Sequence, residues 1–101
     1  MNNLKLTLSC PVALAEQVLE HLFDSDVTVS GFTSFPAHGH GRDFSSASLR
    51  EQVRGRVNTT IIVIVLPRDA ADALLAELRT RFPTPHLVYW TQPVQSFGDF
   101  G

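Results

Sequence analysis

The sequence predicts an α+β fold in which strands and helices follow one another in the order β-α-β-β-α-β. Three observations lead to this prediction: alternating apolar residues near the N-terminus, two apolar stripes with helical spacing, and one long apolar run in the second half of the chain. With 101 residues, 44% of them hydrophobic and 18% charged, the chain has the composition of an ordinary globular protein. This length supports one hydrophobic core, so we expect a single domain over residues 1–101.

The first half of the chain has the pattern of a strand, a helix and a bent second strand. Apolar and polar residues alternate over residues 4–10, which predicts a half-buried strand. Pro11 suits the first turn of a helix, because a proline there loses no intrahelical hydrogen bond, and an apolar stripe then continues to about Phe23. A second strand is expected from Val27, with a bulge or kink at Gly31, where the apolar phase shifts.

The second half repeats this order with a stronger strand signal. Residues 57–66 end in a continuous apolar run, so both faces of this strand should be covered. A second apolar helical stripe follows Pro67 and ends before Pro83, the β-prone residues 87–90 predict the last strand, and residues 94–101 form a tail. Two strand–helix–strand halves with right-handed crossovers give a four-stranded antiparallel sheet with both helices on one face, which is the ferredoxin-like sandwich.

A long polar segment separates the second and third predicted strands. It runs from Pro36 to about Arg56 without apolar periodicity, and loops longer than about 12–15 residues in compact domains are usually functional or disordered. Positive charge is concentrated there, whereas the whole chain has a formal net charge of −2. The charged residues between positions 38 and 58 are Arg42, Asp43, Arg50, Glu51, Arg54 and Arg56. We therefore expect the main site at this loop.

Several functions that occur on this fold lack the residues they need. The turn at residues 9–12 contains no arginine or glycine to hold a phosphate, as an acylphosphatase would require. Cys10 is the single cysteine, so a copper-binding pair of thiolates is absent, and we expect this residue to be a small buried apolar group. The central strands have no stacking aromatic residues, so no nucleic-acid partner is expected. No nucleophile is visibly matched to a base, which argues against an enzyme.

The element order and the ends of the long loop together resemble the PII superfamily of signalling proteins. The run Gly39–Gly41 at the start of the loop and the run Glu51–Arg56 at its end are similar to those of small PII-like proteins associated with heavy-metal efflux transporters of the resistance-nodulation-division type. This resemblance implies a homotrimer with a T-loop at about residues 38–55. It also implies a small effector, often an adenine nucleotide, bound between subunits, and a partner that could be such a membrane transporter.

The resemblance and the residue types give one candidate set of ligand-binding residues. Glycines allow a close approach of the backbone to a ligand, and guanidinium groups recognise phosphate or carboxylate. Arg54 and Arg56 alternate at the start of the predicted third strand and could share a face. The alternatives are arginines solvated in a mobile loop, or ion pairs between subunits. The candidate ligand-binding residues are Gly39, Gly41, Arg42, Arg54 and Arg56.

The spacing of two histidines gives a second candidate site, for a divalent transition metal. His38 and His40 would leave the same face if the second strand continues to them. More ligands would be needed, from His21, His86, Asp43 or a symmetry-related copy, and the alternative is a pair of solvent-exposed loop residues. Two rival functions follow: a metal-binding buffer or chaperone without regulatory output, and a trimeric adaptor that binds no ligand.

The remaining expectations concern location. Residues 1–9 contain no long apolar run, and no part of the chain approaches the roughly 20 apolar residues of a membrane span. A single cysteine fits a reducing compartment. We therefore expect a cytoplasmic protein that is not itself a membrane protein.

Overall fold

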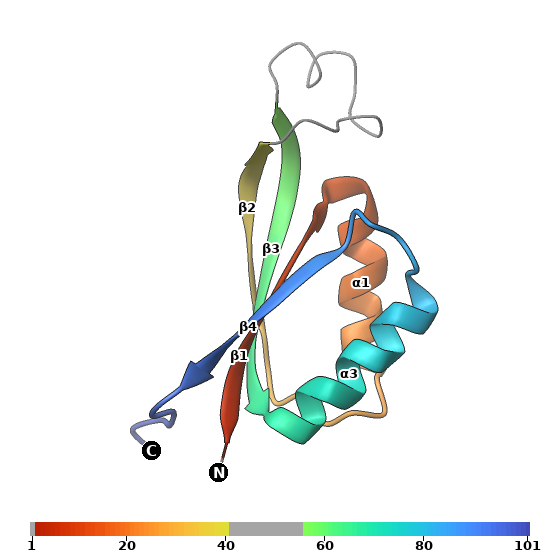
Figure 1. Ribbon diagram of the computed structural model, residues 1–101. Coiled ribbons are helices and arrows are strands. Elements are labelled where there is room, and N and C mark those ends of the chain that lie inside the picture. The colour runs from red at the N-terminus through yellow and green to blue at the C-terminus, as the bar shows by residue number, and fades with distance from the viewer. Residues whose placement is uncertain (1, 41–55) are drawn as a thin grey trace.

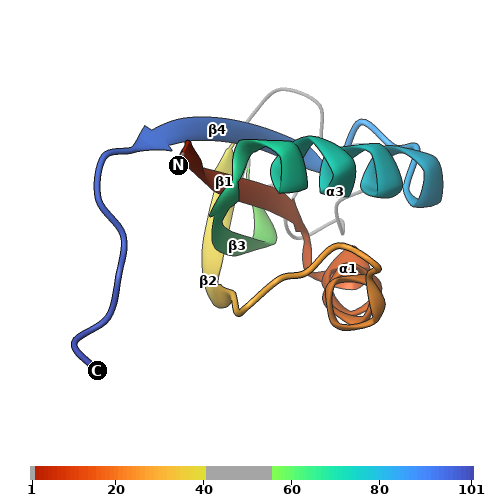
Figure 2. The ribbon, with the colours of Figure 1, turned by 90° about the horizontal axis from the view of Figure 1, so that it is seen from below.

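A computed structural model describes residues 2–40 and 56–101 of the protein (Figure 1). The sheet order is β2-β3-β1-β4 with antiparallel pairs throughout, and both helices lie on one face of the sheet (Figures 1 and 2). This arrangement confirms the predicted ferredoxin-like α+β fold. The elements are β1 (Asn3–Pro11), α1 (Val12–Asp24), β2 (Thr33–His40), β3 (Arg56–Pro67), α3 (Arg68–Arg81) and β4 (Val88–Val94).

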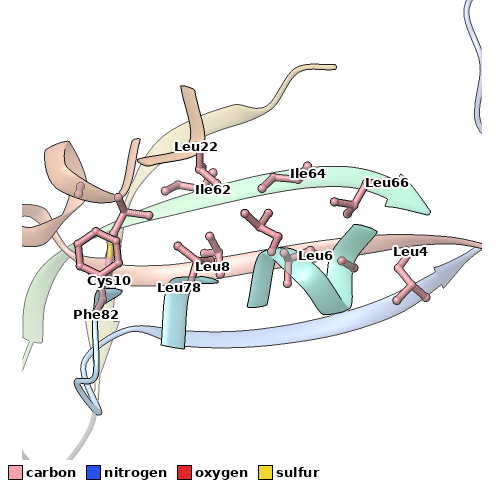
Figure 3. Close-up of a cluster of buried hydrophobic side chains, with 14 residues drawn as sticks. Leu4, Leu6, Leu8, Cys10, Leu22, Ile62, Ile64, Leu66, Leu78 and Phe82 are labelled. Carbon is pink, nitrogen blue, oxygen red and sulfur yellow. The ribbon is translucent and has the colours of Figure 1, made fainter. Parts of the chain in front are cut away.

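The core lies between the helices and the inner face of the sheet, which is the face that the helices cover. The two central strands pair so that Leu6 lies opposite Ile64 and Leu8 opposite Ile62, and all four side chains point toward the helices. Each is at most 1% exposed. Figure 3 shows these side chains meeting residues of α1 and α3 in one continuous cluster. The apolar residues on one face of β1 and β3 thus form the sheet's side of the core.

Both helices begin directly after a proline and bury one apolar stripe. Pro11 precedes α1 and Pro67 precedes α3, where the fixed φ of proline suits the helix start. Helix α3 ends at Arg81, and the backbone N–H of Phe82 donates a hydrogen bond of 2.8 Å to the Leu78 carbonyl. The buried helix residues are Ala15, Val18 and Leu22 of α1 and Ala71, Leu74 and Leu78 of α3.

The second strand differs from its predicted bounds at both ends. It begins at Thr33 rather than Val27. The preceding residues Val27, Val29 and Phe32 belong to the connection from α1, where they pack against the core and have no partner in the sheet among the described residues. The prediction of a strand kinked at Gly31 was therefore wrong. The strand also continues to His40, since backbone pairing with β3 does not depend on apolar side chains.

The last strand is longer than predicted. β4 runs to Val94 through three residues that lack β-prone apolar side chains, and its pairing with β1 explains this extension. Pro93 is tolerated there, because β4 is an edge strand and one side of its backbone needs no ladder hydrogen bond. Pro36 occupies the other edge strand, β2, for the same reason.

A polar contact joins the two helices at the surface. Ser25, just after α1, donates a hydrogen bond of 2.7 Å to Glu77 Oε1 on α3, and His21 Nε2 lies 2.9 Å from the same oxygen. The hydrogen bond from Ser25 and the interaction with His21 lower the pKa of Glu77. His21 is thus occupied by a partner on the neighbouring helix.

Two further expectations can be compared with the structure. Cys10 is buried, as predicted, and its burial raises the pKa of the thiol. Within residues 2–40 and 56–101, neither helix is long and apolar enough to cross a membrane.

Candidate functional site

The candidate site lies at the end of the sheet where β2 ends and β3 begins, called the loop end below. His40 pairs with Arg56 across the two strands, so the residues that flank positions 41–55 are held side by side. The β2–β3 pair reaches beyond the helices here (Figure 1). The antiparallel register also brings Pro11 of β1 and Val88 of β4 to this end, because Pro11 pairs with Thr59 and Val88 pairs with Ser9. All four strands therefore contribute residues to the loop end.

The two candidate metal ligands share a face, as predicted. His38 and His40 lie opposite Asn58 and Arg56 on β3, on the same side of the sheet as the helices, and both are exposed. The proposed third ligand His21 instead contacts Glu77. Within the described ranges, no group of three or more His, Cys, Asp or Glu residues is placed to hold a metal ion. The histidine pair therefore stands alone in this part of the chain.

Gly39 has a structural explanation that the sequence did not reveal. A Cβ atom at this position would lie 2.8 Å from Thr59 Oγ1 and 3.1 Å from Val57 Cγ1, both on β3. The Thr59 hydroxyl is fixed there by donating a hydrogen bond of 3.2 Å to the Val57 carbonyl. This close approach of the two strands is enough to explain the glycine at position 39, and no ligand is needed to explain it.

Of the remaining predicted ligand residues, the structure describes one, Arg56. Arg56 is the first residue of β3, so its backbone position is fixed by the pairing with His40. Gly41, Arg42 and Arg54 lie outside the described residues, as do Asp43, Arg50 and Glu51.

The connection between α3 and β4 adds residues that sequence analysis did not select. A pocket of about 130 Å³ opens between the end of α3 and the start of β4, with Thr84 and Arg79 as polar members of an otherwise mainly apolar lining. A second, shallower pocket of about 320 Å³ lies between this connection and the first turn of α1. Its lining residues are Pro11, Ala13, Leu14, Thr84 and His86.

The shallower pocket has features that suit an anion. The start of α1 has no side-chain cap among the described residues and no acidic residue in its first turn, so its first backbone N–H groups remain available as donors. His86 and Thr84 contribute polar side chains on the opposite side. Thr84 between Pro83 and Pro85, followed directly by His86, was the signal in the sequence that could have identified this connection.

The outer face of the sheet, opposite the helices, is the second candidate surface. Ile61 and Val63 of β3 are half-buried there, and Phe35 and Trp90 of the edge strands are 47% and 43% exposed. At the centre of this face, the Thr7 hydroxyl is buried and has no hydrogen-bond partner among the described residues. A partly uncovered apolar sheet face of this kind is typical of an interaction surface.

Comparison with known proteins gives one family and several structures. A family model described as "Protein of unknown function (DUF3240)" matches residues 1–101. A comparison with curated proteins by sequence gave no match. The crystal structure of a DUF3240 family protein from Shewanella baltica is similar with a TM-score of 0.79 and 19% identity, covering 100% of this chain and 99% of that chain.

Two other similar structures contain nucleotides. CPII, a nitrogen regulatory PII-like protein from Thiomonas intermedia bound to ADP, AMP and bicarbonate, has a TM-score of 0.71 and 18% identity, covering 99% of this chain and 98% of that chain. The GlnK–ATP complex from Bacillus subtilis has a TM-score of 0.66 and 16% identity, covering 93% and 85% of the two chains. At such low identity, these similarities establish a shared fold.

Proposed function

Because the chain belongs to the DUF3240 family and shares its fold with PII-like proteins, we propose that it is a non-catalytic PII-like regulator that binds an adenine nucleotide at the loop end. One observation carries this proposal: the fold matches CPII over 99% of this chain, and that protein was solved with ADP and AMP. The same fold supports many functions, so the residues at the loop end must supply the chemistry.

The loop end offers groups that suit a nucleotide phosphate. Arg54 and Arg56 flank the start of β3, and an arginine can hold a phosphate through two parallel hydrogen bonds. The uncapped first turn of α1 supplies backbone donors and the positive end of a helix dipole. His86 and Thr84 add polar side chains at the same end. We assign the phosphate groups to this end of the sheet.

The proposal includes assembly as a homotrimer through the outer face. Exposed Phe35 and Trp90, with half-buried Ile61 and Val63 between them, would lose their contact with water on association. The number three rests on the resemblance to PII proteins. A nucleotide between subunits would then contact residues of two copies.

Regulation would follow from a difference in affinity between two conformations. A nucleotide that binds better to one arrangement of the segment between β2 and β3 shifts the population toward that arrangement. A partner that recognises the same arrangement would sense the nucleotide. The sequence resemblance suggests a heavy-metal efflux transporter of the resistance-nodulation-division type as this partner.

Calorimetric titration with ADP, AMP and ATP tests the nucleotide site. We expect binding by the unaltered protein, and an affinity at least about tenfold lower for Arg54→Ala/Arg56→Ala, since a charge-assisted hydrogen bond contributes roughly 1.5–3 kcal/mol. Arg68→Ala is the matched control, because Arg68 begins α3 at the opposite end of the sheet. Absence of heat with all three nucleotides, or equal weakening by Arg68→Ala, would contradict the proposal.

Metal binding is the second candidate function, because His38 and His40 are exposed on the same face of β2. Titration with zinc should show binding that His38→Ala/His40→Ala abolishes, with His21→Ala as a control for histidine content, because His21 contacts Glu77 instead. Equal, negligible heats in all three proteins would reject a metal role. A protein that binds neither nucleotide nor metal would favour the ligand-free adaptor.

A further inference from the structure

The chain continues beyond the last strand as an exposed segment, Gln95–Gly101, called the arm below. All of its residues are exposed, and it includes Phe97, 65% exposed, and Phe100, which is fully exposed. Figure 2 shows the arm leaving the end of β4 on the side of the sheet opposite the helices and running away from the body of the protein. Exposure of two phenylalanine rings to water costs free energy. An apolar surface that covered them would therefore stabilise the arm.

The arm is long enough to cross a sheet of this size. Seven extended residues span at most about 23 Å. The distance across four strands, with about 4.8 Å between neighbours, is roughly 14 Å. Within the arm, the Gly101 N–H donates a hydrogen bond of 3.0 Å to Asp99 Oδ1. The segment thus carries its apolar and acidic side chains across a distance comparable with the width of the outer face.

The outer face has the complementary properties. Apolar side chains on both edge strands are partly exposed there, including Phe35 on β2 and Trp90 on β4. Lys5 of β1 lies on the outer face, and the strand positions that share this face in the register carry no acidic residue. The arm carries one acidic residue, Asp99, and no basic residue. Apolar groups and charges of the two surfaces therefore match.

We propose that the arm binds the outer face of a second copy of this chain, with Phe97 and Phe100 against its apolar side chains and Asp99 beside its Lys5. This inference rests on the proposed assembly and specifies the segment that completes it. A second copy is the occupant because one chain carries both surfaces, while its own arm extends away with its rings exposed. In a closed ring, each copy would give an arm to one neighbour and receive one from another.

The main test removes the two aromatic rings. The association constant of Phe97→Ser/Phe100→Ser should fall at least about tenfold, because each buried phenylalanine removes a large apolar area from water. Sedimentation over a range of protein concentrations measures this change. Trp90, the single tryptophan, lies on the outer face and reports association independently by its fluorescence. The matched control is Phe23→Ser, which removes an exposed ring from α1 and should leave association unchanged.

A charge exchange tests the predicted pairing of arm and face. Lys5→Asp and Asp99→Lys should each weaken association, and the double variant should recover most of the loss, since the opposite charges face each other again. Recovery that depends on protein concentration supports binding to a second copy. An unchanged association constant in all arm variants would contradict the proposed binding of the arm and would leave the proposed assembly intact.

Two other outcomes would also contradict binding of the arm to a second copy. A monomer at every concentration would reject the arm and the assembly together, while nucleotide titration would still judge the ligand site separately. A change in Trp90 fluorescence on removing the rings that is independent of protein concentration would show that the arm covers its own sheet.

Discussion

The two faces of the sheet are built from alternate residues of the same strands, yet they differ in how far the chain itself completes them. On the inner face, Leu6 and Ile64 are at most 1% exposed beneath the helices. On the outer face, Phe35 and Trp90 of the edge strands remain 47% and 43% exposed. The comparison shows that this chain encodes one finished core and one apolar surface that stays partly uncovered in the single chain. Substitutions on each face can separate folding from association.

The largest expected effect is on the inner face. Leu6→Ala should lower the free energy of unfolding by about 2–5 kcal/mol, because it leaves a cavity in a fully buried cluster. Urea denaturation measures this loss. Val63→Ala, on the outer face and half-buried, should cost about 1 kcal/mol or less in the dissociated subunit. Equal losses at the two positions would contradict the difference between the faces.

Substitutions on the outer face should change the association constant more than the free energy of unfolding. Phe35→Glu places a charge among the apolar residues of this face, so the association constant should fall at least about tenfold, while unfolding of the dissociated subunit changes by roughly 0.5 kcal/mol or less. Light scattering and urea denaturation measure the two quantities. Ser34→Glu is the matched control, because Ser34 is the exposed neighbour on the opposite face of β2. Equal dissociation by both variants would remove the special role of the outer face.

The third prediction concerns Gly39, at the loop end of the outer face. Gly39→Ala should cost about 1–3 kcal/mol of unfolding free energy, since its methyl group meets Thr59 Oγ1. Gly31→Ala, where nothing lies within 4 Å, should change stability by about 0.5 kcal/mol or less. Thermal denaturation compares the two. Adding Thr59→Ala should recover part of the loss at Gly39, and no recovery would argue against this contact as the cause.

The smallest expected effect is in the helical layer. The pKa of Glu77 is lowered in the folded state, chiefly by the hydrogen bond from Ser25, so its contribution to stability is present above the unfolded pKa of about 4.3 and is lost as the pH falls through the folded pKa. Glu77→Gln should therefore cost less than about 1 kcal/mol at pH 7, because the group is partly exposed. Denaturation from pH 7 to pH 3 should show this difference shrinking, and a constant difference would assign it to packing.

Most of the fold was predictable because apolar residues mark both central strands. Residues 4–10 alternate with the period of a strand, residues 57–66 end in a continuous apolar run, and the two strands pair at the centre of the sheet. The start of β2 was not predictable in this way. Val27 and Val29 alternate as a strand would, but they pack beneath the helices, and only the three-dimensional position of the core distinguishes the two arrangements.

The candidate site was predicted from one segment of the sequence, whereas the structure adds residues from other segments. The basic segment predicts a site at the end where β2 meets β3, and the shared face of His38 and His40 was confirmed. The pockets beside the α3–β4 connection were missed, because their walls come from positions far apart in the chain, such as Leu8 and Tyr89. Gly39 was selected for a ligand, whereas a contact across two strands already requires it.

The pairing of His40 with Arg56 also bears on how this protein can change over evolutionary time. With both flanks fixed in one ladder, doubling the number of residues between them would add only about 0.6 kcal/mol of closure entropy. Inserting or exchanging sequence at this point therefore leaves the buried cluster untouched. One scaffold could acquire new partners by replacing this single stretch.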